Sequence, residues 1–210
     1  MNQKNGKNSL GLDACFEDEA NPIVLFTKWF ADAEKSEVND PNALSIATSS
    51  PEGIPSVRMV LLKGLSNKGF VFYTNFNSKK GNDLKSNPNA SMCFYWKSIR
   101  RQVRVSGKVS TVDKDEADKY FSSRDYGSKI AAWASSQSEV MNNRDDFLNK
   151  IKEFEKKFPD KNNVPRPSHW SGWRVNPEQI EFWIEVKNRT HQRLNYILKE
   201  GNWVKEILYP

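Results

Sequence analysis

Cysteine and histidine are scarce in this chain of 210 residues, which contains only two of each. The cysteines, Cys15 and Cys93, lie far apart, and no CxxC pair occurs. A disulfide framework or a Cys/His zinc site would need several such residues at close spacing. His169 and His191 are equally isolated, so the sequence predicts no metal site.

Long apolar runs are also absent. Residues 1–7 are polar, and no stretch approaches the roughly 18–20 apolar residues that a membrane-spanning helix needs. The sequence therefore predicts neither a signal peptide nor a membrane span, and we expect a cytoplasmic protein.

Three familiar signatures of nucleotide binding or catalysis are missing. The chain contains no GxGxxG and no GxSxG. Residues 64–69 have the glycine spacing of a phosphate-binding loop, but Phe70 stands where that loop requires lysine. This segment is also typical of a hairpin rather than of a strand-to-helix turn, so we exclude a P-loop.

The composition indicates a globular chain with a mild basic excess. Hydrophobic residues make up 37% and aromatic residues 12%, which is enough to build a core and argues against disorder. The chain has 32 basic and 26 acidic residues, a net charge of +6. That excess favours anionic ligands such as phosphate esters, nucleotides or nucleic acid, although ordinary solubilising charge explains it equally well.

The order of elements predicts one α+β domain over residues 21–210, after a polar N-terminal segment, residues 1–20, that we expect to be mobile. Connections between the early strands are too short for parallel crossovers, which favours a mostly antiparallel β-barrel with flanking helices. Apolar residues at helical spacing predict helices near 22–33, 117–121, 130–134 and 147–158, with a short polar helix or loop at 78–85. Strands are predicted at 43–48, 56–65, 70–74, 90–96, 101–112, 170–174, 181–185 and 203–208.

Cations beside apolar strands are the strongest chemical signal. A cation within a strand is costly to bury unless it is paired, so such clusters indicate anion sites, although each one alone is more often a surface residue or an ion pair. Arg58 and Lys63 lie on opposite faces of a regular strand, and a shared ligand would require a bulge or a bend. Further clusters are Lys79 with Lys80, Arg100, Arg101 and Arg104 around Gln102, Arg124 between Tyr120 and Ser128, and Arg189, His191 and Arg193.

Several segments, taken in order and at their spacing, resemble the pyridoxamine 5′-phosphate oxidase family. The resemblance extends from about residue 22 to residue 210, and no single segment would carry it. The segments are RMVLLK at 58–63, FYTN at 72–75, RQVR at 101–104, YFSSR at 120–124, SSQS at 135–138, PRPSHWSG at 165–172, QIEFW at 179–183 and RTHQR at 189–193.

The resemblance implies an FMN-binding split β-barrel that forms a homodimer, with flavin sites at the subunit interface. Such enzymes oxidise pyridoxamine or pyridoxine 5′-phosphate with dioxygen, giving pyridoxal 5′-phosphate and hydrogen peroxide. The implied partners are a phosphorylated pyridine substrate, dioxygen and a second copy of the chain, without nucleic acid or membrane.

The resemblance also implies the site residues, and the cation clusters coincide largely with them. Lys63, Tyr120, Arg124 and Ser128 would surround the substrate phosphate, with Arg189, Thr190 and His191 near its ring. Arg189 and His191 would be the catalytic residues. The FMN contacts would be Arg58, Met59, Val60, Leu61, Leu62, Lys63, Tyr73, Thr74, Lys79, Lys80, Gln102, Gln137, Ser138, Trp183 and Arg193.

Two departures and three alternatives accompany this interpretation. Thr190 and Gln192 replace the Leu and Asp that are usual in the C-terminal motif, and residues 1–20 show no Arg/Tyr segment of the kind that covers the substrate in many members. The alternatives are a flavin oxidase acting on another substrate, as in phenazine biosynthesis, a non-catalytic flavin- or haem-handling barrel, and a nucleic-acid-binding barrel. The phosphate set around Arg124 argues against the first, Arg189 with His191 against the second, and the lack of a basic stripe against the third.

Overall fold

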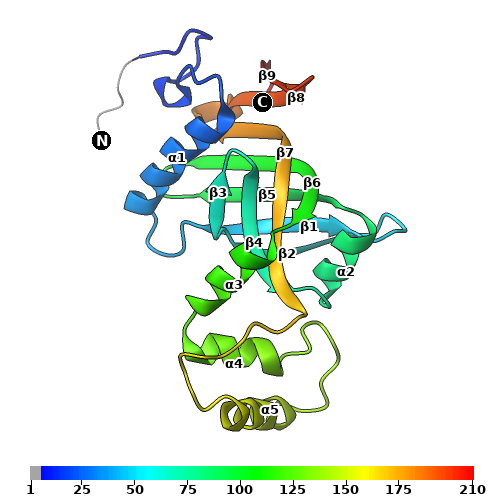
Figure 1. The fold of residues 1–210 in the computed structure, drawn as a ribbon. Coiled ribbons are helices and arrows are strands. Elements are labelled where there is room, and N and C mark those ends of the chain that lie inside the picture. Colours follow the sequence, from blue (N-terminus) through cyan, green and yellow to red (C-terminus); the bar gives the residue numbers. More distant parts are fainter. Residues whose placement is uncertain (1–5) are drawn as a thin grey trace.

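A single curled sheet forms the body of the computed structural model, which describes residues 6–210 (Figure 1). All of its strand pairs in these residues are antiparallel, in the order β2-β1-β5-β6-β7-β4-β3, with β8 and β9 continuing from β7. The strands are β1 (Ala43–Ser49), β2 (Pro55–Leu61), β3 (Gly64–Ser66), β4 (Gly69–Asn75), β5 (Asn89–Trp96), β6 (Arg101–Thr111), β7 (Trp170–Ile184), β8 (Gln192–Lys199) and β9 (Asn202–Leu208). The expected α+β class with a mostly antiparallel sheet is confirmed.

Helix α1 packs on this sheet and contributes to the main core. Its Phe26 ring lies 4.9 Å from the ring of Phe70 and 5.0 Å from that of Phe94, and its Trp29 ring lies 5.1 Å from that of Phe182. Contacts between four elements that are distant in sequence therefore hold the barrel together. The helices are α1 (Pro22–Ser36), α2 (Lys79–Ser86), α3 (Lys114–Ser122), α4 (Tyr126–Ala134) and α5 (Arg144–Lys157), with 3-10 turns at Ala14–Phe16 and Lys187–Arg189.

Strand β7 differs from the two separate strands that the sequence predicts. It runs unbroken for 15 residues and pairs along one edge with β6. Its other edge is shared, since residues 170–175 pair with β4 and residues 179–184 pair with β8. Pro177 lies opposite Gly107 at a shift in register, where a Cβ on Gly107 would stand 2.0 Å from the Asn176 oxygen. This bulge accommodates the proline within the strand.

The described part of the N-terminal segment packs against the barrel. Phe16 is fully buried, with its ring 5.4 Å from that of Trp29. The Trp29 indole donates to the Cys15 carbonyl at 2.6 Å, and the Tyr196 hydroxyl donates to the Glu19 carbonyl at 2.8 Å. Residues 1–5, which share the expectation of mobility, lie outside the described residues. The mobility of residues 1–20 and the domain boundary at residue 20 stay predictions.

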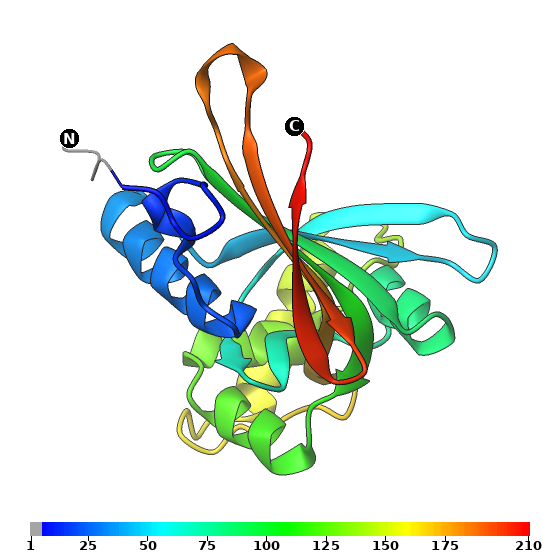
Figure 2. The ribbon, with the colours of Figure 1, turned by 90° about the horizontal axis from the view of Figure 1, so that it is seen from above.

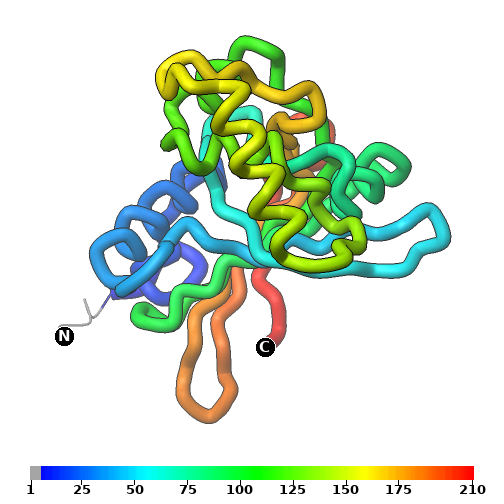
Figure 3. The backbone as a smooth tube through the Cα atoms, turned by 90° about the horizontal axis from the view of Figure 1, so that it is seen from below, coloured from blue at the N-terminus to red at the C-terminus, as the bar shows by residue number. Residues whose placement is uncertain are grey.

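Two parts of the molecule project to opposite sides of the sheet. The helices α3, α4 and α5 gather on one side, and the connection between β7 and β8 extends on the other (Figures 2 and 3). No helix within residues 6–210 is both long and apolar enough to cross a membrane. In the same residues, no three His, Cys, Asp or Glu side chains come together as metal ligands.

Candidate functional site

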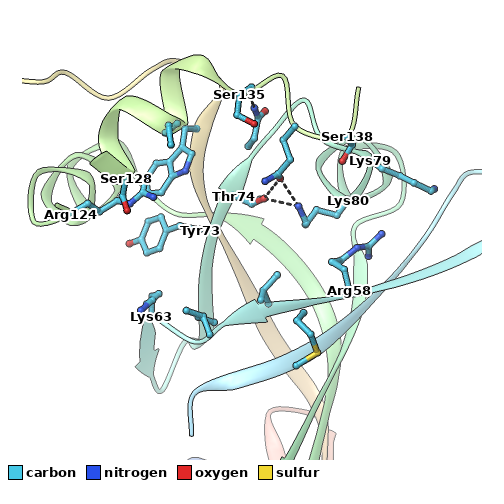
Figure 4. A pocket seen from close by; sticks show the side chains of 18 of the residues that line it. Arg58, Lys63, Tyr73, Thr74, Lys79, Lys80, Arg124, Ser128, Ser135 and Ser138 are labelled. Atoms are coloured by element: carbon cyan, nitrogen blue, oxygen red, sulfur yellow. Dashed lines mark hydrogen bonds between the residues drawn. The ribbon is translucent and has the colours of Figure 1, made fainter. Parts of the chain in front are cut away.

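A cleft of about 850 Å³ lies between the sheet and the helices α2, α3 and α4. Cations occupy both of its ends: Arg58, Lys79 and Lys80 lie at one end, and Arg124 lies at the other beside Ser128 (Figure 4). The cleft brings together many of the residues that the sequence singles out. These are Arg58, Met59, Val60, Leu61, Lys63, Tyr73, Thr74, Lys79, Lys80, Tyr120, Arg124, Ser128, Gln137 and Ser138.

A buried network orients Arg58 at the first end. Its guanidinium donates to Thr48 Oγ1 and to Ser56 Oγ, each at 2.7 Å. The Thr48 hydroxyl in turn donates at 2.6 Å to Asp83, a buried carboxylate on α2 that also pairs with Lys79 at 3.3 Å. Sequence reasoning missed Thr48 and Asp83, which fix the directions of two cations without lining the cleft themselves.

Lys80 is a buried ammonium group surrounded by neutral oxygens. Its Nζ donates to Gln137 Oε1 at 2.7 Å, to Thr74 Oγ1 at 2.9 Å and to Ser78 Oγ at 3.3 Å (Figure 4). Within the described residues no carboxylate lies at ion-pair distance from it. Burial, followed by repulsion from Arg58, lowers the pKa of Lys80 to about 8. A bound anion would offset both causes, so this end is suited to a phosphate group.

Arg124 dominates the second end. Burial lowers the pKa of its guanidinium, and Nη1 is buried without a hydrogen-bond partner. The neighbouring carboxylate of Asp125 caps α4 instead, accepting the Ser128 N–H at 2.8 Å. Since an arginine stays charged at neutral pH, Arg124 is a half-buried cation that lines the cleft and has an unpaired donor.

Tyr120, Arg124 and Ser128 converge although they do not share one helix. Helix α3 ends at Ser122, and α4 begins at Tyr126 after its cap residue Asp125. The chain turns between the two helices, and all three side chains still line the cleft. The three residues, spaced four apart, therefore reach one site because of the turn between α3 and α4, not because they share one helical face.

The strand break after β2 brings Lys63 to the same cleft as Arg58. Strand β2 ends at Leu61, and the Lys63 N–H donates to the Val71 carbonyl at 2.8 Å. The bend that a shared ligand requires is therefore present. Leu62 packs in the main core instead of lining the cleft.

The remaining predicted residues form a second cluster outside this cleft. Gln102, Trp183 and Arg193 are neighbours in register across β6, β7 and β8. Arg193 Nε donates at 2.8 Å to Glu181, a buried carboxylate that also pairs with Arg104 at 3.1 Å. Seven predicted residues thus lie outside the cleft: Leu62 in the main core, and Gln102, Trp183, Arg189, Thr190, His191 and Arg193.

His191 has a defined orientation in the second cluster. Its ring lies 4.6 Å from the Trp183 ring, and its Nδ1 accepts the Val186 N–H at 3.2 Å. Because Nδ1 is an acceptor there, the neutral ring carries its proton on Nε2. Arg189 is exposed, with a positive φ of 60°.

Some lining residues were not predicted. Asn75, Ser135 and Trp170 lie inside the segments that carry the resemblance, so their motifs were available as a signal. For the other four, small or apolar residues common on any helix or strand, no signal existed. The unpredicted lining residues are Ser56, Asn75, Ala131, Ala132, Ser135, Phe147 and Trp170.

Comparisons with known proteins find matches along most of the chain. Residues 30–158 match the family "Pyridoxamine 5′-phosphate oxidase", and residues 170–210 match "Pyridoxine 5′-phosphate oxidase C-terminal dimerisation region". A pyridoxine/pyridoxamine 5′-phosphate oxidase of Pelagibacter ubique is 58% identical, over 98% of this chain and 100% of that protein. One of Sinorhizobium fredii is 50% identical, over 93% and 95%.

Solved structures show the same fold. PhzG from Burkholderia lata, in complex with tetrahydrophenazine-1-carboxylic acid, has a TM-score of 0.88 at 28% identity, over 98% of this chain and 100% of its own. An FMN-binding protein of Nostoc punctiforme related to pyridoxamine 5′-phosphate oxidase has a TM-score of 0.70 at 18% identity, covering 88% and 96%. The predicted split barrel is thus confirmed, and with both family matches and relatives at half identity or more, the chain belongs to the pyridoxine/pyridoxamine 5′-phosphate oxidase family.

Proposed function

We propose that this cleft oxidises pyridoxamine or pyridoxine 5′-phosphate to pyridoxal 5′-phosphate, with FMN as cofactor and dioxygen as acceptor, releasing hydrogen peroxide. The carrying observation is a cleft with a cationic site at each end, where the buried Lys80 and the half-buried Arg124 have no carboxylate at ion-pair distance in the described residues. Two anion sites match two phosphate esters, one on the cofactor and one on the substrate. The 58% identity to an oxidase of this specificity supports the assignment.

The residues present fit FMN. Arg58, Lys79 and Lys80 would hold its phosphate, because their charges converge there and Asp83 is the one carboxylate of the described residues at ion-pair distance from any of them. The cleft lies within the size range of ligand sites, about 300–1,000 Å³, and Val60 and Tyr73 line it between the two ends. When bound, FMN would supply the redox chemistry, the transfer of two electrons from the substrate to dioxygen.

Arg124, Lys63, Tyr120 and Ser128 would bind the substrate phosphate at the opposite end. Two cations and two hydroxyls can satisfy a phosphate dianion, and the free Nη1 of Arg124 is a donor without another partner. Fixing the phosphate there would orient the pyridine ring toward the centre of the cleft.

We further propose a homodimer in which the second cluster of one chain completes the cleft of its partner. Three observations support it: the match of residues 170–210 to a dimerisation region, the position of Arg189 and His191 outside their own cleft, and the apolar outer face of β2. On that face Val57 is 68% and Met59 64% exposed, which is typical of a surface that a partner covers. In the dimer, Arg189 would hold the substrate ring, and His191 would offer its Nε2 proton to it.

Turnover measurements test the activity. The FMN-loaded protein should release hydrogen peroxide with pyridoxamine 5′-phosphate and prefer it to pyridoxamine by about two to three decades in kcat/KM, since several charge-assisted hydrogen bonds at about 1.5–3 kcal/mol each depend on the phosphate. Equal use of both amines would contradict the phosphate site. Peroxide release with tetrahydrophenazine-1-carboxylic acid alone would instead indicate a function like that of PhzG.

Cofactor binding should weaken at alkaline pH. The pKa of Lys80 is about 8 in the free protein, and a bound phosphate would raise it, so binding takes up a proton above pH 8. A phosphate monoester is already a dianion at pH 7, because its second pKa is about 6. The Kd for FMN, followed by flavin fluorescence, should therefore be about tenfold higher at pH 9 than at pH 7.

Lys80→Arg is the matched control, because a guanidinium stays charged throughout this range. Its Kd for FMN should change little between pH 7 and pH 9. An equally flat response in the wild-type protein would remove Lys80 from the phosphate site.

A further inference from the structure

The proposed function does not explain how Arg124 is stabilised in the cleft when no substrate is bound. A guanidinium that is partly withdrawn from water normally pairs with a carboxylate, because an isolated charge is costly to desolvate. Arg124 is half-buried, no carboxylate in the described residues lies at ion-pair distance from it, and its Nη1 has no hydrogen-bond partner. Some other group must keep this cation in place before substrate arrives.

The group beside it is an aromatic ring. The Cζ of Arg124 lies 4.7 Å from the centre of the Trp170 ring and 5.7 Å from that of Phe121. The face of an indole attracts a cation more strongly than that of any other side chain, and the attraction grows when water is excluded. Trp170 is 7% exposed, so the contact is shielded from solvent.

A ring differs from a carboxylate in what it leaves free. A carboxylate would occupy the N–H donors of Arg124 and neutralise its charge, competing with an incoming phosphate. A ring contacts the flat face and takes up none of the N–H donors, and Nη1 is indeed unpaired. Building on the proposed function, we propose that Trp170 is a positioning residue that holds Arg124 charged and open, and so determines the preference for phosphorylated substrate.

Arg166 and Tyr73 fix the position of Trp170, and Gly172 leaves room for this arrangement. Arg166 donates to the Trp170 carbonyl at 2.7 Å and to Asp118 on α3 at 2.6 Å, which ties β7 to the helix that carries Tyr120. The Tyr73 ring lies nearly parallel to the Trp170 ring, at 5.3 Å and 9°. A Cβ on Gly172 would stand 2.9 Å from the Tyr73 ring, so glycine there leaves room for this stack. The ring under Arg124 is thus fixed before any ligand binds.

Graded variants of Trp170 test the proposal. Trp170→Leu keeps apolar bulk but removes the ring, and should reduce the ratio of kcat/KM for pyridoxamine 5′-phosphate to that for pyridoxamine on the order of tenfold. Trp170→Phe retains a weaker ring and should reduce the ratio about threefold. Competitive inhibition by inorganic phosphate should weaken in the same order, which a purely structural role would not produce.

Trp133→Leu is the matched control. Trp133 belongs to the same small aromatic cluster but contacts Phe154, Phe158 and Lys157 rather than Arg124. It should leave the ratio unchanged within about twofold, even where it lowers the melting temperature. In an Arg124→Ala background, Trp170→Leu should have no further effect on the ratio, because the group it positions is gone.

The outcomes separate this proposal from the proposed function. A wild-type protein without preference for the phosphate ester would overturn the substrate assignment itself. A wild-type preference that survives in Trp170→Leu, or in Trp170→Phe if the leucine variant does not fold, would overturn the role of Trp170 alone.

Discussion

Replacing Arg124 by alanine should lower kcat/KM for pyridoxamine 5′-phosphate by about 100-fold and remove most of the preference over pyridoxamine. The guanidinium lines the cleft, and its Nη1 has no hydrogen-bond partner in the described residues, so we expect it to bind the substrate phosphate. Two bonds to a charged group, at about 1.5 kcal/mol each as a lower figure, give about 3 kcal/mol, or two decades. Steady-state kinetics with both amines measures the effect.

Two comparisons make this result specific. Arg124→Lys keeps the charge but loses the planar fork, so it should fall between the wild type and the alanine variant. Turnover of pyridoxamine serves as an internal control, because it does not use the phosphate site. A parallel loss with both amines would indicate general damage to the cleft and contradict the assignment of Arg124.

Mixed dimers of two inactive variants should regain activity. Arg124→Ala damages the cleft, whereas Arg189→Ala damages the cluster proposed to reach into the partner's cleft. A heterodimer of the two would contain one site with both residues intact and one site with neither. The purified heterodimer should therefore have about half the activity of the wild-type dimer, and a random mixture about one quarter, because about half of its dimers are heterodimers.

Co-expression of differently tagged chains, followed by two affinity steps, yields the heterodimer for this measurement. A heterodimer of Arg124→Ala with Lys80→Ala is the control, because both substitutions lie in the cleft and leave no site intact. Activity in neither heterodimer would show that Arg189 acts within its own chain, and would contradict the shared site.

Local pattern predicted most of the fold, and it failed where burial does not alternate. The strands at 90–96 and 101–112 were expected close to their observed bounds of Asn89–Trp96 and Arg101–Thr111. Strand β8 was not expected, because Leu194, Asn195 and Tyr196 are buried in succession and produce no two-residue period. The sequence predicts two strands in place of β7, whose Pro177 is unusual inside a strand.

The sequence predicted an anionic ligand for the site, but spacing alone did not predict which residues come together in the cleft. Cations beside apolar strands indicated anion binding, and the resemblance supplied a residue list, whose individual binding roles stay predictions. That Arg58 and Lys63 share a cleft depends on the break after Leu61, which no spacing rule indicates. That Arg189 lies outside this cleft depends on the connection between β7 and β8, which extends away from the helices α3, α4 and α5. Asp83 gave no signal, because an acidic residue on a short polar helix is usually solvated.

Residues 6–20 are the first described part of the chain to leave the ribosome, yet two of the residues that hold them in place, Gln192 and Tyr196, are synthesised near the end. The Asp13 N–H donates at 2.7 Å to the side chain of Gln192, which follows 179 residues later in the chain. The Glu19 carbonyl accepts from the hydroxyl of Tyr196, which follows 177 residues later. At roughly 5–20 residues per second, this interval lasts roughly 10–35 s. Throughout it, Phe16 lacks the finished surface that buries it. We therefore expect residues 6–20 to pack late, at the same time as β8. A nascent chain released before β8 is synthesised would leave residues 6–20 unfolded.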